Sequence, residues 1–303
     1  MESVLLNSGH EMPCIGLGTY LIPKEKLSSV VGTAYELGYR QFDTAWKYHN
    51  EKELATAFKE NNIKREDVFI TTKFSIYANC KSLSYGDHLI SFKYRSISSV
   101  IEEQLSALET DYIDLYLMHW PYPQYKSIWK VMEEYHKKGV LRSIGVCSFL
   151  PPHLQALERI SDVTPAVNQF EISPLNSQKQ LIQYCQQKRI AVEAMSTFSR
   201  YHSNEPREEI LNNEDICEIA KEHGKSSVQV VLRWMYQQGI VLIPKTWEEI
   251  HLKENISIFD FSLNNEEMMI INKLDGGKFL NYNPYTHLKN VPRRFQGWKG
   301  FDV

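Results

Sequence analysis

The chain has 303 residues, of which 43% are hydrophobic, and it carries a formal net charge of −3. This length allows one large domain or two ordinary ones, and the mixture of charges gives no sign of a nucleic-acid or polyanion binder. No run approaches the ~18 apolar residues of a membrane span, and the amino terminus lacks the basic start and apolar stretch of a signal peptide. We therefore expect a cytoplasmic protein with neither a nucleic-acid nor a membrane partner.

Cysteine and histidine patterns exclude two further classes of protein. The chain has an odd number of cysteines and neither a Cys-x-x-Cys nor a His-Glu-x-x-His motif. A disulfide scaffold and a metal site are therefore not expected. Residues 16–21, GLGTYL, lack the third glycine of a dinucleotide fingerprint, so this stretch is interpreted as a turn.

Eight short apolar runs follow one another along the chain. They are rich in β-branched residues and nearly continuous, as expected for parallel strands that are buried on both faces. The runs span residues 14–19, 41–45, 68–74, 112–120, 143–147, 166–172, 191–196 and 240–245.

Helical patterns lie between these runs. In residues 26–38, Val30, Val31, Ala34 and Leu37 share one face, and the segment stops at a glycine. Similar patterns occupy residues 98–108, 127–139 and 180–189.

Eight strand–helix units in about 300 residues predict an α/β fold, a (β/α)8 TIM barrel. We expect a single domain over residues 1–303, with an N-terminal β-hairpin in residues 3–13 that closes the bottom of the barrel. Two stretches exceed what a barrel needs, residues 74–97 and the tail after Leu274.

Polar residues gather where three neighbouring strands end. Asp43 ends the second strand and Tyr48 follows it, Lys73 lies near the end of the third, and His119 ends the fourth. Active sites of such barrels lie at the C-terminal ends of the strands. A phenol of pKa ~10 needs a neighbouring ammonium to become a useful acid near neutrality, and an imidazole can donate to a developing oxyanion. The set predicts the reduction of a carbonyl group.

The motifs around these residues are similar to those of the aldo-keto reductases. GYRQFDTAWKYHNE (38–51) resembles the first family signature, VFITTK (68–73) and DLYLMHWP (114–121) resemble the segments with the catalytic Lys and His, and LIPKTWEEIHLKEN (242–255) resembles the cofactor signature. The resemblance covers about residues 4–275 and implies reduction of an aldehyde or ketone with NADPH. It implies Tyr48 as proton donor, Lys73 and Asp43 as its tuning pair, and His119 as the group that orients the carbonyl.

The resemblance also implies binding residues. Those for the substrate, a small carbonyl compound, are Tyr20, Lys47, Tyr48, His119 and Trp120. Those for the cofactor are Gly18, Thr19, Asp43, Cys147, Ser148, Gln169, Met195, Ser196, Phe198, Lys245, Thr246, His251, Glu254 and Asn255.

Several of these residues depart from the family pattern. His251 stands where the family usually has an arginine for the 2′-phosphate of NADPH, and a histidine lacks the permanent charge and planar fork of that arginine. Cys147-Ser148 replaces the usual Ser-Asn pair at the nicotinamide, and Met195 replaces an aromatic ring. These changes weaken the phosphate site, but Lys245 keeps a positive charge there. NADPH is still the expected cofactor, with NADH as the alternative.

Two questions stay open at this level. Residues 74–97 either roof part of the site or form a surface excursion that packs its own aromatic side chains, and the tail is expected to fold near the barrel mouth. The chain is expected to be a monomeric reductase, but a nucleotide-binding regulatory or assembly protein on the same barrel is the alternative, because a fold does not dictate function.

Overall fold

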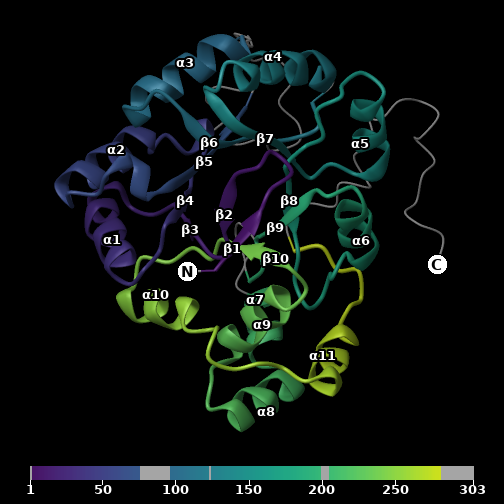
Figure 1. Ribbon diagram of the computed structural model, residues 1–303. Helices are drawn as coiled ribbons and strands as arrows, with labels where there is room; N and C mark the ends of the chain where they lie inside the picture. The colour runs from purple at the N-terminus through teal and green to yellow at the C-terminus, as the bar shows by residue number, and fades with distance from the viewer. Residues whose placement is uncertain (1, 76–95, 123, 199–204, 281–303) are drawn as a thin grey trace, which may run out of the picture.

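The computed structural model describes residues 2–75, 96–122, 124–198 and 205–280, and in these residues parallel strands alternate with helices around a ring (Figure 1). The strands are β3 (Leu17–Gly18), β4 (Gln41–Asp43), β5 (Phe69–Phe74), β6 (Ile113–Met118), β7 (Leu141–Cys147), β8 (Val167–Glu171), β9 (Ala191–Met195) and β10 (Ile240–Leu242). Each overlaps one of the eight predicted runs and pairs with its neighbours in chain order.

Hydrogen bonds between the first and last strands close the ring. Gly16 N–H donates to Leu242 O at 2.8 Å, and Leu242 N–H donates to Cys14 O at 2.9 Å. A parallel bridge joins Ile15 to Leu242 at the same place. The predicted (β/α)8 barrel is therefore confirmed.

Helices surround the strands, as Figure 1 shows. They are α1 (Lys24–Glu36), α2 (Glu51–Glu60), α3 (Ile97–Leu108), α4 (Tyr125–Lys137), α5 (Pro151–Glu158), α6 (Lys179–Gln187), α7 (Glu205–Leu211), α8 (Glu214–His223), α9 (Ser227–Tyr236), α10 (Glu249–Ile256) and α11 (Asn265–Asn272). Among the described residues, no helix is long and apolar enough to cross a membrane.

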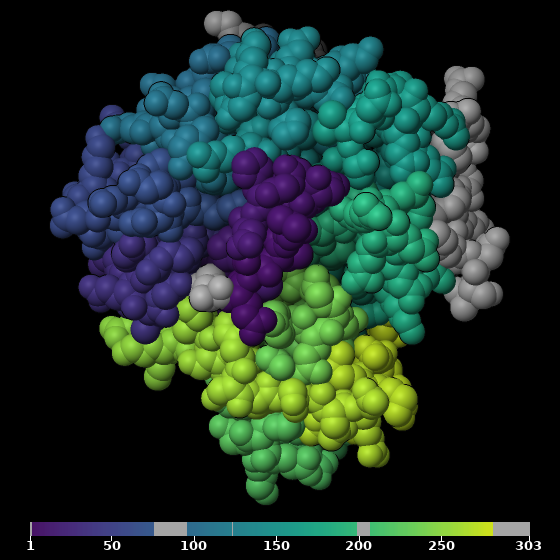
Figure 2. Space-filling model, viewed as in Figure 1, coloured from purple at the N-terminus to yellow at the C-terminus, as the bar shows by residue number. Residues whose placement is uncertain are grey.

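The N-terminal hairpin closes one end of the barrel. Strands β1 (Ser3–Leu5) and β2 (Glu11–Pro13) pair antiparallel, and the purple N-terminal segment lies across the middle of the face in Figure 2. Between them, the Asn7 side chain donates to the backbone oxygens of Pro165 and Arg189, which lie just before β8 and β9, at 3.0 Å each. The predicted hairpin and its place at the bottom of the barrel are confirmed.

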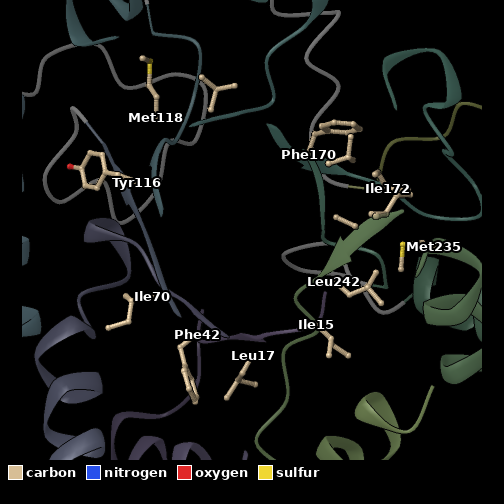
Figure 3. Close-up of a cluster of buried hydrophobic side chains, with 14 of the residues drawn as sticks. Ile15, Leu17, Phe42, Ile70, Tyr116, Met118, Phe170, Ile172, Met235 and Leu242 are labelled. Carbon is tan, nitrogen blue, oxygen red and sulfur yellow. The ribbon is translucent and has the colours of Figure 1, made fainter. Parts of the chain in front are cut away.

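Side chains alternate between the outside and the inside of the strand ring. Outward-facing residues such as Phe42 and Ile70 pack beneath the helices (Figure 3), and Phe42 meets Phe58 of α2 edge-on with ring centroids 5.1 Å apart. A smaller apolar cluster of inward-facing strand residues and residues of the hairpin region comprises Leu6, Met12, Phe69, Leu115, Leu117, Cys147, Ala166, Val167 and Val241. Nearer the carboxyl ends the inward positions become polar, and the candidate site begins there.

Some predictions concern residues beyond those the structure describes. The roofing loop falls mostly on residues 76–95 and the tail on residues 281–303, so the expectations for both lie outside the described residues. The expectation of one domain over residues 1–303 stays a prediction.

Candidate active site

Asp43 and Lys73 form a buried ion pair at the carboxyl ends of two neighbouring strands. Lys73 Nζ lies 2.5 and 2.6 Å from the two carboxylate oxygens of Asp43 and donates to Thr44 O at 2.9 Å. The two side chains are only 1% and 3% exposed. Burial raises the pKa of the Asp43 carboxyl, while the Lys73 ammonium and the Gln169 amide act against that rise. The charge at the end of β4 therefore has its partner one strand away.

Tyr48 lies next to this ion pair, on the side of Lys73. It ends a short 3₁₀ helix, Trp46–Tyr48, that follows β4, and its hydroxyl lies 3.5 Å from Lys73 Nζ. Its ring lies 4.7 Å from the ring of Tyr20 and meets His119 edge-on at 6.0 Å, measured between centroids. An ammonium this close favours the phenolate form of the tyrosine.

Asn50 holds the loop that carries Tyr48. Its side-chain oxygen accepts from Thr44 Oγ1 at 2.7 Å, and its amide nitrogen donates to Thr19 O and Thr19 Oγ1, each at 3.1 Å. These bonds join the loop to the end of β3, so Tyr48 is positioned by two strands.

His119 follows β6 and completes the group. Its ring stacks on Trp120 with centroids 6.0 Å apart and an interplanar angle of 10°. Burial lowers the pKa of His119 well below 6.5, and the charges of Lys73 and Lys47 lower it further. The imidazole is therefore neutral near pH 7 and offers one N–H donor.

One cavity of about 400 Å³ connects this group with the loop after β10. The predicted site residues that line it are Gly18, Tyr20, Asp43, Tyr48, His119, Trp120, Gln169, Met195, Ser196, Phe198, Lys245, Thr246, His251, Glu254 and Asn255. Residues that the sequence places more than 200 positions apart thus share a single cavity. The described residues include no cluster of His, Cys, Asp or Glu that would hold a metal ion.

A sequence profile described as the Aldo/keto reductase family matches residues 14–276 of the chain. The chain belongs to this family. It is 37% identical over 284 residues to methylglyoxal reductase DkgA of Escherichia coli O157:H7 and 36% identical over 285 residues to glyoxal reductase of Bacillus subtilis (strain 168), with 93% of this chain and 96% of each relative covered. Among solved structures, an aldo-keto reductase complexed with NADPH matches with a TM-score of 0.83 and 31% identity, over 100% of this chain and 96% of that one.

Some predicted residues of this aldo/keto reductase lie behind the cavity wall. Lys73 is covered by Asp43 and Tyr48, and Thr19 Oγ1 donates to Asp43 O at 2.9 Å. Cys147 and Ser148 are buried at the end of β7, where the Cys147 sulfur lies 3.9 Å from Gln169 Oε1. Neither these residues nor Lys47 lines the cavity. Their binding roles stay predictions.

Gly18 has a structural reason to be a glycine. A Cβ built on it would lie 2.9 Å from Ile243 O and 3.6 Å from Lys245 Cβ. The chain segments that follow β10 approach β3 this closely where the barrel closes. A side chain at this position would therefore displace the segment that carries Lys245.

The sequence analysis missed a buried carboxyl beneath the site. Glu193 of β9 is fully buried, and its two oxygens accept from the amides of Gln41 and Gln169, each at 2.6 Å. Gln169 also donates to Asp43 Oδ2 at 3.0 Å. Glu193 points into the ring as Asp43 and Lys73 do, and only its inward position in the strand pattern could have indicated it. Burial and the nearby Asp43 charge raise the pKa of Glu193 to about 8.

Replacing Glu193 with glutamine is expected to raise the free energy of unfolding relative to the wild-type protein, and this difference should grow as pH rises. Because the folded-state pKa of Glu193 is about 8 and its ordinary value is 4.5, the folded state holds a proton that the unfolded state releases between these values. The free energy of unfolding of the wild-type protein therefore falls as pH rises through this window, by on the order of a few kcal/mol at pH 8. The amide of the glutamine variant does not titrate, so the variant does not show this fall. Urea unfolding at pH 5 and pH 8 measures the difference, and a gap between the two proteins that does not widen with pH would contradict the assignment.

Arg207 is a second residue that the sequence analysis did not select. It belongs to α7 and lines the same cavity as Tyr48 and Lys245. No sequence motif marks it, because its place in the cavity depends on where tertiary packing puts α7.

Proposed function

We propose that the protein reduces small aldehydes or ketones to alcohols with NADPH, and that compounds with two adjacent carbonyl groups are among its substrates. One observation carries the proposal: the buried Lys73 ammonium contacts the Asp43 carboxylate and lies 3.5 Å from the Tyr48 hydroxyl, and Asp43, Tyr48 and His119 line one cavity. The methylglyoxal and glyoxal reductases among its relatives support the substrate class.

The cavity suits a phosphorylated dinucleotide. Lys245 and Thr246 would hold the phosphate on the adenosine ribose, Glu254 and Asn255 the adenine end, and Gln169 the nicotinamide, since all five residues line the same cavity as Tyr48. Lys245 makes no ion pair among the described residues, so its charge is free to meet a phosphate. NADPH supplies a hydride to the carbonyl carbon.

The chain supplies the proton and the polarisation. As negative charge develops on the carbonyl oxygen, the Tyr48 hydroxyl donates its proton to that oxygen and becomes a phenolate. The Lys73 ammonium, 3.5 Å away, stabilises this phenolate, and Asp43 holds the ammonium in place. His119 donates a hydrogen bond from its N–H to the same oxygen and so orients the substrate.

The protonation state of His119 separates its role from that of Tyr48. Since burial keeps the pKa of His119 well below 6.5, the imidazole lacks the second, acidic proton of an imidazolium near pH 7. A neutral imidazole donates a hydrogen bond but is a poor acid, which leaves Tyr48 as the proton donor.

The first test is a fluorescence titration of the purified protein with NADPH and with NADH, followed by turnover of methylglyoxal and glyoxal. We expect tighter binding of NADPH than of NADH, and loss of NADPH absorbance when either dicarbonyl compound is added. Binding of neither nucleotide would overturn the proposal. Binding without reduction of any carbonyl in a broad panel would favour a nucleotide-binding regulatory or assembly role.

We further propose that the protein acts as a one-domain monomer in the cytoplasm. The relatives align along 93% of the chain without a second unit, which supports one domain. Size-exclusion chromatography with light scattering should give the mass of a single chain, and a mass of two chains would contradict this part of the proposal.

A further inference from the structure

Two cations line the cavity, Arg207 of α7 and Lys245 just after β10. Within the described ranges neither of them is salt-bridged to a carboxylate, and Lys245 Nζ lies 4.6 Å from the ring centroid of Trp247. Glu254 lines the cavity as well but pairs with neither cation. Two like charges that share one cavity repel each other, so the cavity favours an anionic ligand.

Arg207 and Lys245 line the same cavity, and their positive charges oppose each other there. Partial burial lowers the pKa of Lys245, and the positive charge of Arg207 lowers it further. A dianion bound between them would remove this repulsion and gain charge-assisted hydrogen bonds from both.

His251 of α10, at the usual position of the family's arginine, is partly engaged by a neighbouring side chain. Its Nδ1 lies 3.4 Å from Thr246 Oγ1, and that hydroxyl also accepts from Glu248 N–H at 3.1 Å. An imidazole with one nitrogen turned to the protein has one nitrogen left for a ligand, whereas a guanidinium has a planar fork of donors. The segment after β10 therefore lacks a fork of its own.

We propose that Arg207 supplies the missing guanidinium and binds the 2′-phosphate of NADPH together with Lys245. This chain would thus select NADPH over NADH with an arginine from α7 rather than with one at the position of His251. The proposal rests on the proposed function, since it names the residue that sets the cofactor preference of that reaction.

The test compares Arg207→Gln with the wild-type protein in binding rather than in turnover. Tryptophan fluorescence titrations with NADPH, NADH, 2′,5′-ADP and 5′-AMP separate the 2′-phosphate from the rest of the nucleotide. We expect Arg207→Gln to weaken NADPH and 2′,5′-ADP by about 10- to 100-fold, the value of a hydrogen-bonded charged group, and to leave NADH and 5′-AMP unchanged. Arg159→Gln, which removes an exposed arginine at the end of α5 away from the cavity, is the matched control and should bind all four as the wild type does.

A rescue variant makes the result specific. Adding His251→Arg to Arg207→Gln should restore NADPH affinity, because it returns a guanidinium to the cavity from α10. If Arg207→Gln weakens NADPH and NADH equally, or weakens neither, this inference is wrong while the proposed function stands. If the wild-type protein binds neither dinucleotide, the proposed function fails and the inference fails with it.

Discussion

Replacing Tyr48 with phenylalanine is expected to lower the rate of carbonyl reduction by about 10²- to 10⁴-fold, the usual contribution of a positioned general acid. The change removes one oxygen atom and keeps the ring that packs against Tyr20 and His119. The affinity for NADPH should therefore stay within about threefold, because no charged group is lost and a shift of a few tenths of a kcal/mol is all that ring packing would change. Single-turnover rates with methylglyoxal and fluorescence titrations with NADPH measure the two quantities separately.

Tyr35→Phe is the control for this experiment. Tyr35 lies in α1, where its hydroxyl donates to Asp67 at 3.2 Å on the exposed surface, and losing that bond should leave the reduction rate unchanged. Full activity in Tyr48→Phe would remove Tyr48 as the proton donor and with it the proposed mechanism. A loss of NADPH affinity as large as the loss of rate would show instead that the tyrosine serves mainly to bind the cofactor.

Replacing Lys73 with methionine should damage both activity and stability. The Lys73 side chain is fully buried. A methionine fills a similar volume but leaves the Asp43 carboxylate buried without its cationic partner. Removing one member of a buried pair costs about 3–5 kcal/mol of unfolding free energy. The reduction rate should fall by about 10²-fold or more, because the phenolate of Tyr48 loses its stabilising charge.

The double variant Asp43→Asn with Lys73→Met separates these two effects. Removing both charges relieves the uncompensated carboxylate, so the urea midpoint should recover part of the loss seen in Lys73→Met alone. The reduction rate should not recover, since the ammonium beside Tyr48 is still missing. Recovery of activity together with stability would mean that Lys73 acts only through folding, and the role assigned to it would be wrong.

The position of the Asp43–Lys73 pair could be predicted from the sequence, because it depends on the pattern of apolar runs. Asp43 and Lys73 stand at the ends of apolar runs, and in a parallel barrel those ends meet at one mouth. The structure places the two charges in contact as this reasoning predicts. The binding roles of Cys147 and Ser148 stay predictions, because both residues are buried and neither lines the cavity.

Glu193 and Arg207 show where such reasoning fails. Glu193 lies within an apolar run that predicts only a buried strand. Its contact with Gln169 arises from the register of β8 and β9, in which Gln169 pairs with Glu193. Arg207 belongs to a polar helix with no motif, and it joins Lys245 in the cavity lining only in the folded barrel. A residue's neighbours across the barrel cannot be read from spacing along the chain.

The sequence by itself determined the alternation of strands and helices, the closing hairpin, the family and the identity of the four polar residues at the strand ends. The elements and the residues at their ends follow from hydrophobic periodicity and turn residues, which are local and act wherever the segment lies. The family follows from the resemblance of motifs such as residues 38–51. The tertiary structure alone decided which charges are paired and which are free. Lys73 is neutralised by Asp43, whereas Arg207 and Lys245 face one cavity without ion-pair partners among the described residues. Pairing depends on distances of a few ångströms across the barrel, and those distances exist only once the ring has closed.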